Sequence, residues 1–190
     1  MIGWPQTLMV AQGDGTAITA AAATSMLTGA AAHAKKLVPA NFFNYIGQKL
    51  RIVASGRISS VITTPGTARF DVRFGSTVVF DGLAILLDTV AGHTNVGWDL
   101  NVELTLRIVG TAAQFHGEGR WTCEDILGVP ATAPKGVLSA KLPWNSPPAL
   151  GTAFDGTVSN VIDLFFTQTV ATGSVQLHQY ELSVPNGFAE

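Results

Sequence analysis

The chain has 190 residues, of which only 13% are charged and 47% are hydrophobic, and its formal net charge is −2. Globular domains usually carry about 25% charged residues, so we expect much of the surface to be covered by copies of the chain or by a partner. Eleven dispersed Lys and Arg residues and a net negative charge argue against nucleic acid as the principal ligand.

The cysteine content and the N-terminal composition bear on where the protein is made. Cys123 is alone, so it cannot form an internal disulfide, and beside Trp121 we expect it to be a small buried hydrophobe. The uncharged segment 15–34 consists mostly of Ala, Thr, Gly and Ser, which are too weakly apolar to hold a segment in lipid. No basic region of a signal peptide precedes it. We therefore predict no membrane association and synthesis in the cytoplasm.

The N-terminal part is the least regular in pattern. Residues 1–15 contain the large apolar residues Trp4 and Met9 and close on the turn-prone Gly13-Asp14-Gly15, which predicts an irregular N-terminal arm. Residues 16–28 are ambiguous, because their alanines favour a helix while their threonines and lack of charge favour a covered strand. We favour the strand. A short strand follows at 35–39, and 41–47 is predicted to be a loop that carries Phe42, Phe43 and Tyr45.

Residues 48–74 alternate between apolar and polar side chains, which is the period-two pattern of a half-buried strand. The phase slips near Ser59-Ser60, which predicts a bulge. Thr64-Pro65-Gly66-Thr67 is a strong turn signal, so the strands on either side of it are predicted to pair as a hairpin. Asp71 lies between Arg69 and Arg73 on the outward face, where we expect charge matching across strands.

The clearest element is the stretch 96–110, VGWDLNVELTLRIVG. One face of this long strand is apolar and contains Trp98, Leu100, Val102, Leu104, Leu106 and Ile108. The other face carries Asp99, Asn101, Glu103 and Arg107, which we expect to meet water or a polar subunit contact. The strand 112–122 follows, with Gly117 and Gly119 on its inner face, which predicts the close approach of a bulky neighbour such as Trp98 or Phe166.

Residues 123–158 differ from the rest of the chain. They hold five of the nine prolines, and strand-like alternation stops, so we predict a long proline-rich loop with Trp144 as an apolar anchor. The last two predicted strands, 159–171 and 174–184, are joined by Ala171-Thr172-Gly173, which predicts a tight hairpin. A phase change near His178 predicts a second bulge.

These elements define the expected fold class. We predict an all-β protein, an antiparallel jelly-roll-like β-sandwich of about eight to ten strands, because no helical patterns alternate with the strands. The expected organisation is an N-terminal arm over 1–15 and one sandwich domain over 16–190, with the proline-rich loop 123–158 as an excursion from it.

No catalytic signature is present in the sequence. The four histidines lack the spacing of a zinc site, and no nucleophile elbow, phosphate-binding loop or EF-hand loop occurs. His116 and Glu118, two residues apart on one strand face, are the best pair for acid–base chemistry, although a solvated or interface face explains them better. We therefore expect no enzyme activity, no metal and no cofactor.

Several strands resemble structural proteins of tailed bacteriophages. The likeness lies in NYIGQKLRIVASGRIS followed by TPGTARFDVRFGSTVVFDG, in WDLNVELTLRIVG with FHGEGRWT, and in SVQLHQYELS near the end. It covers roughly 41–122 and 159–184. The family is similar to jelly-roll virion proteins that assemble as trimers and decorate or cement capsids, or form fibre and appendage domains. The resemblance implies no catalytic residues and does not distinguish the head from the tail or fibre.

Three functions follow as hypotheses. The first is a non-enzymatic virion protein, expected to be a homotrimer made in the host bacterial cytoplasm. It would decorate or cement the head by binding the major capsid protein or other virion proteins through Trp4, Met9 and Trp144. The second is a receptor-binding or carbohydrate-binding module of a tail or fibre, with Phe42, Phe43 and Tyr45 as exposed aromatics. The third, an enzyme on a β-sandwich, rests only on His116 and Glu118.

Overall fold

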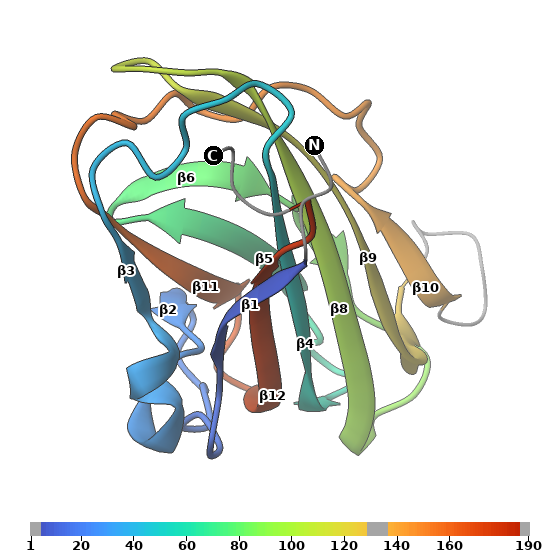
Figure 1. Ribbon diagram of the computed structural model, residues 1–190. Helices are drawn as coiled ribbons and strands as arrows, with labels where there is room; N and C mark the ends of the chain where they lie inside the picture. The colour runs from blue at the N-terminus through green and yellow to red at the C-terminus, as the bar shows by residue number, and fades with distance from the viewer. Residues whose placement is uncertain (1–4, 129–136, 187–190) are drawn as a thin grey trace.

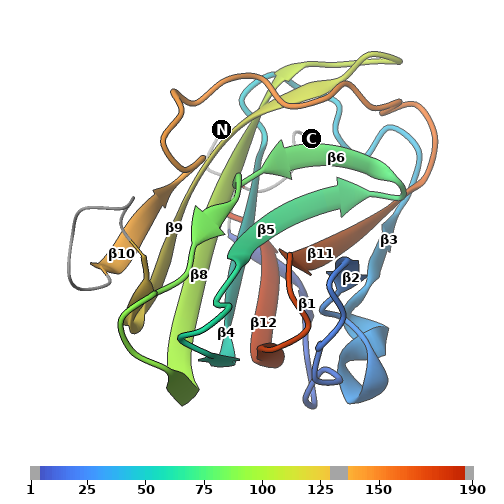
Figure 2. The same ribbon diagram turned by 180° about the vertical axis from the view of Figure 1, so that it is seen from behind.

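The computed structural model describes residues 5–128 and 137–186, which form two antiparallel sheets packed face to face (Figures 1 and 2). Sheet A contains, in spatial order, β1 (Gln6–Val10), β12 (Ser174–Val184), β4 (Lys49–Ser60), β8 (His93–Ile108), β9 (Gln114–Leu127) and β10 (Val137–Leu142). Sheet B contains β2 (Ala23–Ser25), β11 (Asn160–Gln168), β5 (Thr67–Phe74) and β6 (Thr77–Asp81), with β3 (Lys36–Val38) paired to β11 and β7 (Ile85–Leu86) paired to β5. The predicted all-β sandwich is confirmed.

The long predicted strand is β8, the centre of sheet A. It has 16 residues and pairs with β4 on one side and β9 on the other. Its predicted apolar face is buried from Trp98 to Leu106, because these side chains alternate inward and meet sheet B. Ile108 is an exception, with 39% of its surface exposed, since the pairing with β9 shifts between Leu106 and Ile108 and the strand ends there.

Aromatic rings join the two sheets in the core. Phe70 of sheet B lies about 5 Å from the rings of Trp98, Trp121 and Phe166, with centroid distances of 5.0–5.1 Å. A second group, nearer the β8–β9 hairpin, contains Phe43, Phe74, Phe115 and Phe154. Such edge-to-face and offset contacts add to the free energy gained from burying the ring surface.

Both predicted hairpins are wrong. β4 and β5, which flank residues 64–67, belong to different sheets, and so do β11 and β12, which flank residues 171–173. Both connections therefore cross from one layer of the sandwich to the other. Pro-Gly and Thr-Gly sequences favour a reversal of the chain, but the partner that a strand takes afterwards depends on long-range pairing. β4 pairs with β12 and β8.

The bulge predictions are confirmed, whereas the glycine neighbours differ from those expected. Register shifts occur between Ile58 and Ser60 and between Leu177 and Gln179. The Cα of Gly117 faces the side chains of Phe80 and Leu104, and Gly119 faces the backbone of Asn101 and the side chain of Val102. Neither glycine is placed against Trp98 or Phe166.

The N-terminal segment contains more sheet pairing than its pattern indicated. Residues 6–10, expected to be irregular, form β1, which extends sheet A beside β12. Within 16–28, expected to be a strand, only Ala23–Ser25 is one, and Ile18 makes an isolated bridge with Val175. A short 3-10 helix follows over Gly29–Ala34. No helix in the described ranges is long and apolar enough to span a membrane.

The expected loop 123–158 contains two strand segments. β9 continues through Leu127, and Val137–Leu142 form β10 at the edge of sheet A. The stretch 143–151 then runs between β6 at the edge of sheet B and β9 of sheet A: Trp144 N donates to Gly82 O, just after β6, at 2.9 Å, and Gly151 N donates to Phe115 O of β9 at 2.8 Å. A Cβ at Gly151 would lie 1.9 Å from Val79 O, so only glycine allows this close approach. The proline-rich stretch thus protects an edge that could otherwise pair with another chain.

Candidate functional site

The three residues predicted as interface anchors have different positions. Trp4 lies outside the described residues. Met9, on β1, is half-buried and packs against the core. Trp144 follows β10, is also half-buried, and packs against the core. A role of these residues in binding a partner stays a prediction.

Trp144 lies in a hollow with a volume of about 420 Å³. The hollow is lined by Lys141, Pro143, Trp144, Asn145, Ser146, Pro147 and Pro148. Prolines fix the backbone φ angle, and the hydrogen bond from Trp144 N to Gly82 O ties the segment to the end of β6. The tryptophan is therefore held at a partly exposed position on a restrained backbone.

A polar groove crosses the outer face of sheet A next to this hollow. Its volume is about 510 Å³, and it is lined by Arg51, Asn101, Glu103, Glu118, Gly119, Arg120 and Lys141. Lys141 belongs to both the groove and the Trp144 hollow. The alternation of the strands places these side chains outward, because their neighbours in sequence fill the core.

The strand register arranges the groove in cross-strand rows. Arg51 of β4 pairs with Glu103 of β8, which pairs with Glu118 of β9. In the adjacent row Asn101 pairs with Arg120, which pairs with Lys141 of β10. The groove therefore uses four successive strands of one sheet, whose spacing fixes where its polar groups lie.

Charge is concentrated on this face. The chain has 24 charged residues, 11 Lys or Arg and 13 Asp or Glu, and eleven of these 24 project from the outer face of sheet A. They are Lys49, Arg51, Arg57, Asp99, Glu103, Arg107, Glu118, Arg120, Glu124, Lys141 and Glu181. The polar face predicted for the long strand is thus part of a surface that extends over the whole sheet.

The outer face of sheet B uses its charges differently. Asp71 is completely buried there and binds the guanidinium groups of both Arg69 and Arg73. The charge matching predicted around Asp71 therefore runs mainly along one strand, with Arg69 also 3.3 Å from Asp81 of the next strand. Arg73 further lies 4.0 Å above the ring of Phe165. These charged groups therefore bind one another and the Phe165 ring within sheet B.

A second buried carboxylate on sheet B is Asp163. It accepts a hydrogen bond from Ser25 Oγ at 2.8 Å and pairs with Lys35 Nζ at 2.9 Å. Burial raises its pKa above the ordinary value, and these two partners oppose the shift without cancelling it. Its contacts join β11 to β2 and to the end of the 3-10 helix, so its role is structural.

Two of the four histidines, His93 and His178, each lie next to one carboxylate. His93 lies 3.0 Å from Asp88, and His178 lies 3.0 Å from Asp14. Glu118, the predicted partner of His116, forms an ion pair with Lys141 at 3.0 Å. Within residues 5–128 and 137–186, no group of three or more His, Cys, Asp or Glu side chains is placed to hold a metal ion.

The aromatic loop expected to be exposed is largely turned into the protein. Phe43 is buried, with 3% of its surface exposed, and packs against Phe74, Phe115 and Phe154. Phe42 packs against the edge of the same core, and burial raises the pKa of Tyr45. An exposed cluster of Phe42, Phe43 and Tyr45 is therefore a wrong prediction, because Phe43 closes one end of the sandwich.

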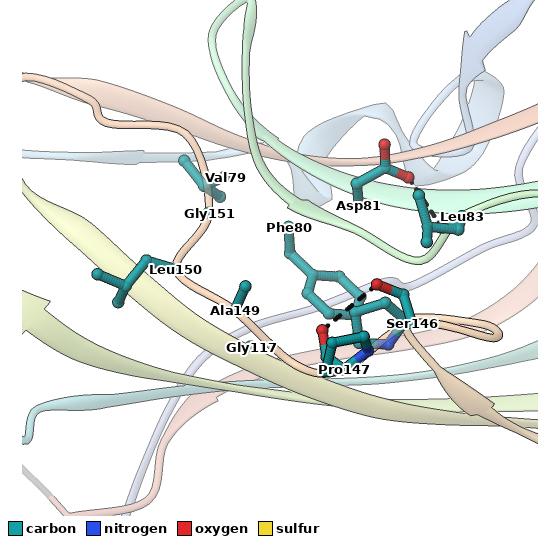
Figure 3. A pocket seen from close by; sticks show the side chains of 11 residues that line it. Val79, Phe80, Asp81, Leu83, Gly117, Ser146, Pro147, Ala149, Leu150 and Gly151 are labelled. Carbon is teal, nitrogen blue, oxygen red and sulfur yellow. Dashed lines mark hydrogen bonds between the residues drawn. The ribbon is translucent and has the colours of Figure 1, made fainter.

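A smaller cavity of about 170 Å³ lies between β6, β9 and the stretch 146–151 (Figure 3). Val79, Phe80, Leu83 and Leu150 make its wall largely apolar, and its one carboxylate, Asp81, accepts a hydrogen bond from Leu83 N at 2.9 Å. Ligand pockets usually enclose about 300–1,000 Å³. This cavity is too small, and its polar groups too engaged, to be the preferred site.

Cys123 is buried, as predicted. Burial raises the pKa of its thiol to about 12, so the thiolate is absent at neutral pH.

Comparisons with known proteins do not assign this chain to a family. No known family matches this sequence, and no curated protein matches it. One solved structure, described as "Structure of the CBM2 module of Lactobacillus casei BL23 phage J-1 evolved Dit", shows a distant likeness with 8% sequence identity over 82% of this chain and 70% of that chain. The TM-score is 0.32. At this level the likeness says nothing about what the present chain does.

The groove was only partly foreseen from the sequence. The outward positions of Asn101 and Glu103 follow from the alternation of β8, but Arg51, Arg120 and Lys141 come from three other strands. In the sequence, Arg51 and Arg120 are marked by their outward phase in alternating strands, whereas Lys141 lies in the proline-rich segment and has no such signal. Which of these outward residues become neighbours depends on the strand order, which the sequence pattern does not contain.

Proposed function

We propose that this protein is a non-enzymatic β-sandwich module of a bacteriophage particle and that it binds carbohydrate on the outer face of sheet A. The resemblance of its strands to structural proteins of tailed phages supports the first part. The second part is carried by one observation: the Trp144 hollow and the polar groove are neighbours that share Lys141 as a lining residue.

That combination suits a sugar chain. Sugar rings present apolar faces that pack on an aromatic side chain, while their hydroxyl groups exchange hydrogen bonds with amide, carboxylate and guanidinium groups. The hollow supplies Trp144, and the groove supplies Asn101, Arg51 and Arg120. Both surfaces are open and shallow compared with a buried active site, as binding of a polymer requires.

A glycan array tests this function. Wild-type protein is expected to bind a defined group of glycans, and Trp144→Ala is expected to lose most of this binding. Because Trp144 also packs against the core, Trp144→Ala is expected to lower Tm as well, so binding is measured well below the Tm of the variant, with its fold checked by circular dichroism. The matched control is Leu138→Ala, which alters a 64% exposed apolar residue of β10 outside the hollow and the groove. Absence of glycan binding by the wild type, or full binding by Trp144→Ala, would contradict the proposal.

A second candidate is a homotrimeric decoration or cement protein that binds the major capsid protein or another virion protein. The observation in its favour is an apolar end of the sandwich, where Ile46 is 65% exposed, Val158 49%, Val109 40% and Ile108 39%. Hydrogen bonds between Gly47 N and Leu106 O and between Gly156 N and Gly110 O tie these segments together. In Figure 1 they gather at the top of the molecule.

Light scattering tests the second candidate. The decoration or cement function predicts a homotrimer, and the variants Ile46→Ser and Val158→Ser are expected to weaken its association, because each substitution places a polar group on the contact surface. A strict monomer at high concentration, together with absence from purified heads by electron microscopy, would remove this candidate.

A further inference from the structure

Two arginines of the groove have no partner for their charge. In the described part of the chain, neither Arg51 nor Arg120 has a carboxylate within 4.0 Å or a side-chain hydrogen bond. Three other arginines are bonded: Arg57 donates to Gln176 Oε1 through Nε at 3.0 Å and Nη2 at 2.7 Å, and Arg69 and Arg73 bind Asp71. Arg107 also lacks such a partner among the described residues but does not line the groove. Two guanidinium groups in one groove are therefore available to a ligand.

The acidic groups of the groove are already neutralised by lysines. Glu103 lies 3.6 Å from Lys49 Nζ, and Glu118 lies 3.0 Å from Lys141 Nζ. The residues that line the groove include three positive and two negative side chains, although the whole protein has a net charge of −2. Its charge is therefore opposite in sign to that of the protein.

The spacing of the two free arginines favours a polymer. Arg51 and Arg120 lie two strands apart and one row apart, which separates their backbones by roughly 12 Å from standard strand spacings. Asn101 lies on β8, the strand between them, and can both donate to and accept from hydroxyl groups. With this backbone separation, two anionic groups of one polymer chain can each bind a different arginine.

We propose that the groove binds an anionic polysaccharide, with Arg51 and Arg120 each holding a carboxylate or phosphate group of the repeating unit. A guanidinium group donates two parallel hydrogen bonds to either anion, and such charge-assisted pairs are stronger than neutral ones. This inference rests on the proposed carbohydrate function and specifies the class of sugar. Trp144, at the other side of Lys141, then contacts the uncharged part of the same chain.

The experiment is titration calorimetry in about 50 mM salt with four polymers as probes. Polygalacturonate is a polysaccharide that carries carboxylates, phosphomannan is one that carries phosphates, dextran is neutral, and single-stranded DNA is a polyanion without pyranose rings. The proposal expects binding to one or both of the first two, weakening as salt is added because exposed charges are screened. Which of the two binds identifies the anionic group.

The variants separate the groove from general charge. Arg51→Gln/Arg120→Gln is expected to weaken binding to the anionic polysaccharide about tenfold or more, since each lost charge-assisted contact is worth a severalfold change. Arg57→Gln is the matched control, because it removes a positive charge from the same face at a residue already bonded to Gln176. It is expected to retain wild-type affinity, and circular dichroism verifies that all variants fold.

Three results would overturn the inference: equal affinity of the double variant and the wild type, no binding to either anionic polysaccharide, or equally tight binding to single-stranded DNA. The two proposals fail in different ways. Binding to neutral glycans that needs Trp144 but neither arginine refutes the anionic specificity and leaves the carbohydrate function intact. If the wild-type protein binds no glycan at all, both the carbohydrate function and the anionic specificity are refuted.

Discussion

Gly117 provides a sharp test of how the two sheets pack. It lies on the inner face of β9, where a Cβ would lie 2.4 Å from Phe80 Cδ2 and 2.8 Å from Leu104 Cδ2. Both distances are shorter than van der Waals contact allows. Leu104 is fully buried, whereas Phe80 is 3% exposed and lines the cavity of about 170 Å³ shown in Figure 3. Gly117→Ala therefore forces the Phe80 ring to shift, or Leu104 to leave its packed position, to make room for one methyl group.

The expected cost follows from these contacts. Overpacking of a well-packed core costs about 1–3 kcal/mol, and replacing glycine by alanine in a strand returns roughly 0.5–1 kcal/mol. The net loss in the free energy of unfolding then lies at about 0–2.5 kcal/mol, with a midpoint of about 1.2 kcal/mol. At about 2–4 °C per kcal/mol for a chain of this size, the midpoint lowers Tm by about 3–5 °C, which differential scanning calorimetry resolves.

The control is Gly97→Ala on the neighbouring strand of the same sheet. A Cβ there meets only Glu124 Oε1, at 3.8 Å, which is an ordinary contact. The Tm of Gly97→Ala is expected to equal or slightly exceed that of the wild type. If Gly117→Ala and Gly97→Ala melt at the same temperature, the packing of Phe80 and Leu104 around Gly117 is not as described, and the reasoning is refuted.

Three further predictions concern the buried polar groups. Asp71→Ala is expected to lower stability by about 2–3 kcal/mol, since it leaves Arg69 and Arg73 without their shared carboxylate. Asp99→Ala, at an exposed carboxylate of β8, should shift the urea midpoint far less, and equal urea midpoints of the two variants would contradict this. Burial tends to raise the pKa of Asp88, but hydrogen bonds from His93, Val90 and Ala91 outweigh this effect and lower the pKa below the ordinary value. The carboxylate therefore stabilises the fold above about pH 4, and this stabilisation is lost as the pH falls through the pKa of the folded state. The Tm advantage of wild type over Asp88→Asn should therefore shrink on acidification from pH 6 to pH 3, and a constant difference would refute the assignment. Because the pKa of Cys123 is raised to about 12, native protein should resist iodoacetamide at pH 8 while urea-unfolded protein reacts, and rapid labelling of the native state by mass spectrometry would show that the thiol is accessible.

The two outer faces of the sandwich use charge in opposite ways. On sheet B, Asp71 and Asp163 are buried and bound by Arg69, Arg73 and Lys35, so little charge is left for a ligand. On sheet A, Arg51 and Arg120 stay exposed and without a carboxylate partner among the described residues. A charge-poor protein that concentrates its free charge on one sheet has a preferred side for polar binding, and this asymmetry underlies both proposals.

Local pattern was enough to predict individual strands. The alternation of apolar and polar residues predicted that β8 is buried on one face from Trp98 to Leu106, and slips in its phase predicted the bulges near Ser60 and His178. These features depend on neighbours in sequence, because a strand exposes every second residue to the same face. The outward position of Asn101 and Glu103 follows for the same reason.

Strand pairing was not predictable in the same way. Turn residues at 64–67 and 171–173 indicate only that the chain reverses, and both reversals cross between sheets. The proline-rich segment gave no periodic signal, although Val137–Leu142 completes sheet A and Gly151 lies against β6. Residues 6–10 are strand because β12 offers them a free edge, which no property of their own sequence reveals.

The sequence by itself determined the all-β class, the long central strand, the buried thiol of Cys123 and the scarcity of charge, because each depends on composition or on a period of two. Only the tertiary structure decided that Arg51, Asn101, Arg120 and Lys141 share one groove. They come from four strands whose order is β4, β8, β9 and β10, and that order is set by which apolar faces pack best across the whole core. The candidate site is thus a product of the sheet rather than of any one segment.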